Sequence, residues 1–249
     1  MNSAWSNIKA IAKRELGGYF ASPVAYVFIV IFLLLNGFFT FMLGKLFERG
    51  EASLAAFFQW HPWLYLFLVP AAGMRLWSEE RRLGTMELLL TMPVTAWQAI
   101  VGKFLASWLF LGLALALTFP VWITVNILGG PDNGVIFCGY IGSFLLAGAY
   151  LAVGCLTSAM TRNQVISFIL SVVICLFLIL AGWPPITDML VQWAPAWLVD
   201  TVASFSVIPH FQGLQMGVID SRDLIFFGSM IGFALFATGV VIRNLRSGH

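Results

Sequence analysis

The chain has 249 residues, of which 60% are hydrophobic and only 10% are charged, whereas about 25% are charged in an average soluble domain. So few charges cannot cover a water-soluble surface, and a net charge of +2 offers no basic face for nucleic acid. The composition and net charge exclude a water-soluble protein and a nucleic-acid-binding protein, and they predict an all-α chain embedded in a membrane.

Residues 1–22 are predicted to form a cytoplasmic interfacial helix. The apolar side chains of this segment recur at three- and four-residue spacing, at Trp5, Ile8, Ala12, Leu16 and Tyr19. Such an amphipathic helix would lie flat on the cytoplasmic leaflet of the membrane. The alternative is that it packs against the protein's own cytoplasmic face.

Residues 23–249 form the predicted transmembrane domain. A helix needs about 20 residues to cross a hydrocarbon core of about 30 Å. Six apolar segments meet this length: 23–44, 54–77, 104–128, 135–160, 165–183 and 224–242. If both termini are cytoplasmic, every lysine and arginine except Lys45, Arg49 and Arg222 is inside, as the positive-inside rule requires. The sequence therefore predicts a multi-pass protein of a bacterial inner membrane.

Between the fifth and sixth predicted spans, residues 184–223 are too long and too apolar for a simple loop. Prolines interrupt this region, and Asp200 lies in its most hydrophobic part. A full span here would place the carboxylate at the bilayer centre, at a cost of about 2.5 to 3.5 kcal/mol, and would turn the C-terminal arginines outward. We therefore expect a re-entrant or interfacial helical hairpin on the outer side.

The connection between the second and third spans, residues 75–98, is predicted to be a cytoplasmic loop that a partner protein can hold. It combines a dense charge cluster at residues 79–82 with a short amphipathic segment. Gly84 can adopt a backbone conformation closed to other residues, so the chain can break there before a new helix. Thr95 and Gln98 predict a capping box. The plainer interpretation is a solvated anchor that only fixes the topology.

Two runs of residues resemble a known family. The run Glu-Glu-Arg-Arg-x-Gly-Thr-x-Glu-Leu-Leu-Leu-x-x-Pro-Val-x-x-Trp, which starts at Glu79, resembles the intracellular loop of ABC-2 type permeases, the membrane subunits of type V ABC transporters. The run from His210 to Leu224 is similar to the branch that contains the gliding-motility permease and the permease of nitrous-oxide reductase maturation. The resemblance implies a homodimer, or a pseudodimer with a related permease, docked on two cytoplasmic ABC ATPase subunits.

The resemblance also implies which residues meet the ATPase. In that family the short helix after the second span is the coupling helix, which corresponds by position to residues 84–91 here. The implied docking residues lie at this helix and its entrance: Glu79, Glu80, Arg81, Gly84, Thr85, Glu87 and Leu88. ATP and Mg would be bound by the partner ATPase, and an auxiliary periplasmic or membrane protein is a further partner that the resemblance leaves open.

The chain itself carries no catalytic motif that we recognise. The Gly-Lys pair Gly102-Lys103 lacks the preceding glycine and the following hydroxyl residue of a Walker motif. The histidines, cysteines and acids show no metal-ligand spacing. We therefore expect a permease subunit and not an enzyme, with no cofactor and no metal bound directly.

A few residues within the spans are candidates for a substrate pathway or its gate: Asn36, His61, Pro62 and Asn126. His61 could line a path or respond to pH. The plainer interpretation is that it donates to a neighbouring carbonyl or reaches the membrane interface. Small residues along the fourth span, from Gly139 to Gly154, indicate close helix packing.

The function expected from the sequence is the membrane-spanning half of an ATP-driven transporter, with export as its direction. Two alternatives stay open. A secondary transporter would show ion-dependent flux without an ATPase, although the predicted spans carry no charged residue at depth. A membrane scaffold would anchor an ATPase for mechanical or assembly work without moving a solute.

Overall fold

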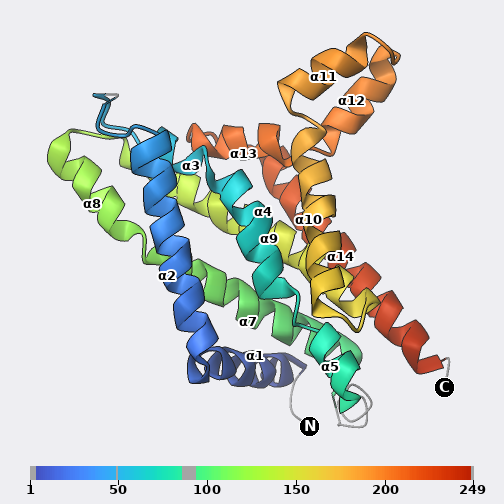
Figure 1. Ribbon diagram of the computed structural model, residues 1–249. Coiled ribbons are helices and arrows are strands. Elements are labelled where there is room, and N and C mark those ends of the chain that lie inside the picture. The colour runs from blue at the N-terminus through green and yellow to red at the C-terminus, as the bar shows by residue number, and fades with distance from the viewer. Residues whose placement is uncertain (1–3, 49, 86–93, 248–249) are drawn as a thin grey trace.

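Every element of the computed structural model is helical among the residues that it describes, which are 4–48, 50–85 and 94–247. This confirms the all-α fold class. In chain order the elements are α1 (Ala4–Ala21), α2 (Pro23–Phe38) continued by the π-helical turn η1 (Phe39–Leu43), α3 (Ala55–Phe58), α4 (His61–Gly73), α5 (Ser78–Leu83), α7 (Ala96–Ala116), α8 (Phe119–Leu128), α9 (Asn133–Met160), α10 (Gln164–Leu180), α11 (Pro184–Val191), α12 (Ala196–Ser204), α13 (Val207–Gln215) and α14 (Ser221–Ser247) (Figure 1).

Polar residues begin the long helices at the points where the apolar runs start. The side chains of Ser22 and Asp132 cap α2 and α9 by accepting backbone amides of the first turn. The predicted capping box is present at the start of α7. Thr95 Oγ1 accepts from the Gln98 amide at 3.3 Å, and Gln98 Oε1 accepts from the Thr95 amide at 3.1 Å. The local sequence therefore sets where these helices begin.

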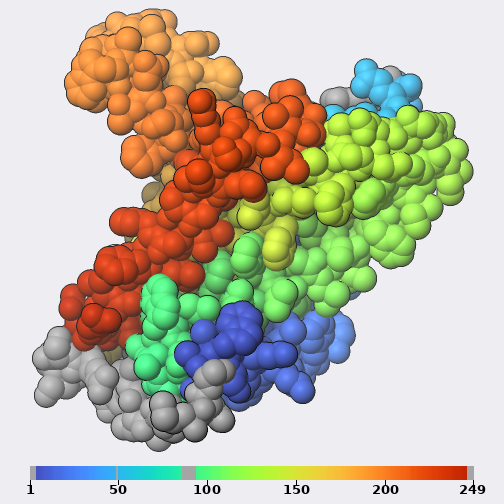
Figure 2. Space-filling view, turned by 180° about the vertical axis from the view of Figure 1, so that it is seen from behind, coloured from blue at the N-terminus to red at the C-terminus, as the bar shows by residue number. Residues whose placement is uncertain are grey.

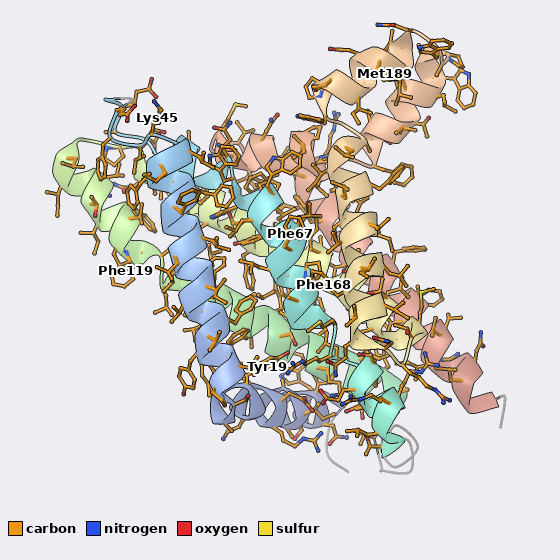
Figure 3. The ribbon with its side chains drawn as sticks, viewed as in Figure 1. Tyr19, Lys45, Phe67, Phe119, Phe168 and Met189 are labelled. Carbon is orange, nitrogen blue, oxygen red and sulfur yellow. The ribbon has the colours of Figure 1, made fainter. Side chains whose placement is uncertain are left out.

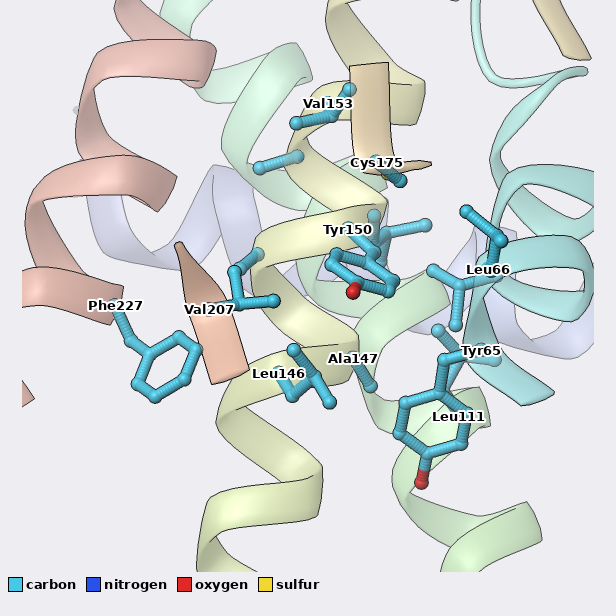
Figure 4. Close-up of a cluster of buried hydrophobic side chains, with 14 of the residues drawn as sticks. Tyr65, Leu66, Leu111, Leu146, Ala147, Tyr150, Val153, Cys175, Val207 and Phe227 are labelled. Atoms are coloured by element: carbon cyan, nitrogen blue, oxygen red, sulfur yellow. The ribbon is translucent and has the colours of Figure 1, made fainter. Parts of the chain in front are cut away.

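The central helix of the fold is α9. In the most apolar stretch of α9, 67% of the residues are buried inside the protein, whereas the corresponding share is 22% for α2 with η1 and 28% for α14. Small residues let its neighbours approach closely, because the backbone of Gly148 faces the ring of Trp108, and Gly154 faces Gly73 of α4. Figure 4 shows the side chains of α4, α10, α13 and α14 that gather around this helix. The predicted small-residue face is thus used for packing within the subunit.

Four helical segments in the described part of the chain are long and apolar enough to cross a membrane: residues 23–43, 96–128, 133–160 and 221–245. A fifth would be the pair α10 and α11, which is bent by 68°. The predicted second span, 54–77, is divided into α3, α4 and a turn. The 13 residues of α4 reach only about 20 Å at 1.5 Å per residue, which is less than a hydrocarbon core of about 30 Å. The structure thus supports a multi-pass membrane protein with four or five spanning helices by this criterion.

The bundle has two distinct ends. Helices α1 and α5 and the C-terminal end of α14 lie at one end, the lower one in Figure 1, which we call the basal end. At the opposite end lie α3, α13 and a helical hairpin made of α11 and α12. The hairpin stands off the body of the molecule, as Figure 2 shows from the other side, whereas α13 packs on α9 through Phe211 and Leu214. The region 184–223 therefore contains a helical hairpin followed by a separate packed helix, and the re-entrant placement of the hairpin stays a prediction.

The N-terminal helix α1 packs along α7. Gly102 of α7 permits this approach, since a side chain there would meet Ile11 of α1 at 2.8 Å. Tyr19 stacks on Phe110 with ring centroids 4.9 Å apart and shares a 2.8 Å hydrogen bond with Ser107. Of the two possibilities that the sequence left for this segment, the structure therefore shows the helix packed against the protein's own surface.

Candidate functional site

The predicted docking loop begins at a bend that we call the elbow, residues 74–85. Helix α5 forms its middle, and Gly84 ends that helix in the left-handed conformation, with φ 70° and ψ 8°. This confirms the break that the sequence predicted at Gly84. Thr85 follows, with its hydroxyl 3.5 Å from the carbonyl oxygen of Glu80. The predicted docking residues Glu87 and Leu88 lie outside the described residues.

Hydrogen bonds join the elbow to the end of α9. The backbone amides of Trp77 and Ser78 both donate to Ser158 Oγ at 2.9 Å, and the same hydroxyl donates to the Met74 carbonyl at 2.9 Å. One buried serine therefore binds the elbow at three backbone positions.

Arg81 makes a second link between the elbow and α9. Its guanidinium donates to the Ala159 carbonyl at 2.6 Å, in the last turn of α9. A cation at this position interacts favourably with the negative end of the helix dipole. Desolvation, together with the neighbouring Arg162 cation, lowers the pKa of Arg81 from its usual value. A guanidinium nevertheless stays charged at physiological pH.

A buried lysine joins the elbow to α7 and α1. Lys103 is only 5% exposed, and its ammonium lies 2.8 Å from a Glu80 carboxylate oxygen and 3.3 Å from a Glu15 oxygen. The ammonium also lies 5.6 Å from the centre of the Trp77 ring. We call Glu15, Glu80 and Lys103 the ion-pair cluster. It connects three helices at the basal end, where Figure 3 shows side-chain nitrogens and oxygens gathered around α1 and α5.

Sequence reasoning missed the ion-pair cluster. It placed Lys103 among the cytoplasmic positive charges that set the topology, outside a span starting at residue 104. In the structure α7 begins eight residues earlier than that span, at Ala96, so Lys103 lies two turns inside a helix that packs against α1 and α9. A lysine within an otherwise apolar helix was the available signal, because such a charge needs a partner.

The elbow therefore has an inner and an outer face. Glu80 and Arg81 turn inward to α7 and α9, as described above. Glu79 and Arg82 face outward, 3.8 Å apart, with their side chains 41% and 60% exposed. The contact of Glu79, Glu80 and Arg81 with an ATPase stays a prediction, and of these three Glu79 offers the most accessible charge.

A second polar cluster lies deep in the bundle between α2, α4 and α9. His61 is fully buried, with Nδ1 2.6 Å from Ser143 Oγ and Nε2 3.3 Å from Asn36 Nδ2. Its ring stacks on Tyr65 with centroids 5.1 Å apart. The plainer interpretation of His61 is thus wrong, because both ring nitrogens contact side chains and the ring does not reach the surface.

The other predicted pathway residues divide into two groups. Asn36 joins His61 in the buried cluster, and Pro62 occupies the first turn of α4, where its missing amide hydrogen costs nothing. Asn126 lies elsewhere, on the exposed side of α8, and its amide exchanges hydrogen bonds of 3.1 Å with Asn133. The structure therefore brings Asn36 to His61, which Pro62 follows in the chain, and places Asn126 apart from them.

A family model described as ABC-2 family transporter protein matches residues 63–195, from α4 to the end of the turn after α11. The match spans more than half of the chain and includes the elbow, Lys103 and Ser158. The chain belongs to the ABC-2 transporter family. It is therefore a membrane permease subunit of an ABC transporter, a class that works with an ABC ATPase. A search of curated proteins found no significant match.

The described part of this ABC-2 permease contains no group of three histidine, cysteine or acidic side chains that could hold a metal ion. Its three cysteines are free, buried and separate. At the basal end its ionic groups form the elbow and the ion-pair cluster, and at the opposite end His210 Nδ1 lies 2.7 Å from Asp223 Oδ1.

Proposed function

We propose that this ABC-2 permease is the membrane-spanning subunit of an ATP-driven exporter, and that the elbow with its following loop receives force from a separate ABC ATPase. The observation that carries the proposal is the attachment of the elbow. Ser158 and Arg81 bind it to α9, and Lys103 binds it to α7 and α1. A loop that served only to reverse the chain would not need these buried links.

The attachments suggest how motion would pass into the bundle. An ATPase that pulls on the loop beyond Gly84 would move α5, and α5 cannot move without carrying or breaking the Glu80–Lys103 ion pair and the Ser158 hydrogen bonds. Because α9 is the central packed helix, a displacement at its end would be transmitted to α4, α10 and α14. ATP and Mg would be bound by the ATPase and not by this chain.

The proposal also includes an orientation of the permease in the membrane and a composition of the whole transporter. The basal end would face the cytoplasm of a bacterial inner membrane, with both termini inside. Six spans would result if α4 and α10 each cross, with α11 and α12 as the outer re-entrant hairpin. The permease would work as a homodimer, or with a related permease, on two ATPase copies. The run from His210 favours the gliding-motility and nitrous-oxide-reductase-maturation branch, in which an auxiliary subunit is a further partner.

A secondary transporter is the second candidate, and the buried His61 cluster is the observation that favours it. A titratable ring held by Asn36 and Ser143 within a bundle is a feature that proton-coupled carriers use. Reconstituted vesicles distinguish the two. Flux that needs the ATPase and ATP supports the proposed function, whereas flux driven by a pH gradient in the absence of the ATPase would replace it.

The docking claim is tested by charge reversal in the elbow and in the loop that follows it. The permease is co-expressed with the ABC ATPase of its gene neighbourhood, and Glu79→Lys is combined with Glu87→Lys. We expect the ATPase that co-purifies to fall at least fivefold, with normal membrane insertion. The matched control is Glu48→Lys with Glu51→Lys, two exposed acids at the opposite end, which should leave co-purification unchanged. Equal recovery in both variants would defeat the docking claim.

A further inference from the structure

A cavity of about 540 Å³ opens at the basal end between α1, α2, α4, α5 and α7. Its volume lies within the range of about 300 to 1,000 Å³ that is usual for ligand sites. One part of the wall is apolar and includes Val27, Phe28 and Ile31 of α2 and Leu68 and Ala72 of α4. The cavity can therefore bury a hydrocarbon chain.

The other part of the cavity wall is charged. Glu15 and Lys103 come from α1 and α7, and Arg75, Glu79 and Glu80 come from the elbow. The cavity is thus amphipathic along its length, with its polar part at the level of α1 and α5. A ligand that matches both parts must carry an apolar tail and a charged head.

The charged groups of the cavity that remain accessible indicate which ligand headgroup would fit it. Lys103 is neutralised by Glu15 and Glu80, so it offers little to a ligand. Arg75 is exposed and makes no ion pair with another described residue, while Glu79 has only the exposed Arg82 as partner at 3.8 Å. The cavity therefore presents one accessible guanidinium and one accessible carboxylate, four residues apart in the elbow.

A guanidinium is the preferred partner of a phosphate, and a carboxylate pairs well with an ammonium group. We propose that this cavity binds one phospholipid with a zwitterionic headgroup, whose phosphate lies at Arg75 and whose ammonium lies at Glu79, with an acyl chain between α2 and α4. The occupant would touch both α1 and the elbow. The proposal does not rest on the transport function, because lipid binding to the permease alone would establish it.

The test uses the purified full-length permease in detergent, stripped of lipid and examined by native mass spectrometry. The probes are phosphatidylethanolamine and phosphatidylglycerol with identical acyl chains. We expect one phosphatidylethanolamine to bind at least fivefold more tightly than phosphatidylglycerol. Equal binding of the two lipids, or many equivalent sites for each, would show ordinary annular lipid and overturn the proposal.

Two pairs of variants locate the site. Val27→Trp fills the cavity, whereas Val30→Trp is its control, since Val30 is on the same helix, has nearly the same exposure (54% against 55%) and does not line the cavity. Arg75→Gln removes the phosphate partner, and Arg243→Gln is the control, since Arg243 is exposed on α14 and does not line the cavity. We expect the first member of each pair to weaken phosphatidylethanolamine binding about tenfold and the control to leave it unchanged. If Val27→Trp fails to fold, the arginine pair decides alone, and equal effects of its two members would refute the proposal.

Discussion

Replacing Lys103 with methionine tests the ion-pair cluster most directly. The ammonium lies 2.8 Å from a Glu80 oxygen and 3.3 Å from a Glu15 oxygen. With an effective dielectric constant of about 20, these separations give gross attractions of about 6 and about 5 kcal/mol. Desolvation of the three groups offsets most of this. The two carboxylate side chains stay 20% and 24% exposed, so we expect Lys103→Met to lower the free energy of unfolding by about 3 kcal/mol, the lower end for a broken buried pair.

The double variant Lys103→Met with Glu80→Gln removes one of the charges left behind and should recover at least half of the loss. Lys45→Met is the matched control, because Lys45 pairs with Glu48 at 2.9 Å on an exposed turn and its loss should not change the unfolding midpoint. Unfolding is followed by tryptophan fluorescence in mixed detergent and dodecyl sulfate micelles. The reasoning is refuted if Lys103→Met unfolds together with the Lys45→Met control, or if Glu80→Gln deepens the loss.

Three further substitutions probe the elbow and the packing of α9 in the same unfolding assay. Gly84→Ala places a side chain in a left-handed conformation and should cost about 1 to 2 kcal/mol; a neutral result would mean that the turn rearranges freely. Gly148→Ala brings a methyl group to 2.7 Å from Trp108 and should cost about 1 to 3 kcal/mol, whereas Gly37→Ala, with open space around it, should cost nothing. Ser158→Ala leaves two elbow amides without an acceptor and should cost about 1 to 3 kcal/mol, with a fall in permease-stimulated ATPase activity. Stability at the wild-type level would show that the hydroxyl is replaced by water.

Local features of the fold could be predicted because their causes are local. The capping box of Thr95 and Gln98 and the break at Gly84 follow from the chemistry of residues close in the chain, and both are confirmed. The small residues of the fourth span also indicated correctly that other helices pack against it. The division of the predicted second span could not be read in the same way, because hydropathy averages over a turn such as residues 74–77 and does not detect it.

The candidate site depended on contacts between distant residues. Ser158 lies about eighty residues from the two backbone amides that donate to its hydroxyl. No sequence pattern near Trp77 or Ser158 predicts these hydrogen bonds. Likewise, Glu80 was predicted to face a partner, but the packing of α7 against α1 placed Lys103 where it draws that carboxylate inward. The sequence showed which residues are charged, but it did not show which way their side chains point.

The sequence by itself determined that this protein lies in a membrane, that it is helical, and that a dense charge cluster lies in one loop, since hydropathy and capping are properties of neighbouring residues. Only the tertiary structure decided that the loop is tied through α5 to α1, α7 and α9, that His61 is enclosed, and that an amphipathic cavity lies beside the elbow. These features arise where helices from distant parts of the chain meet. Their geometry is set by how the small residues of α9 let its neighbours approach, which becomes defined only when all of them pack together.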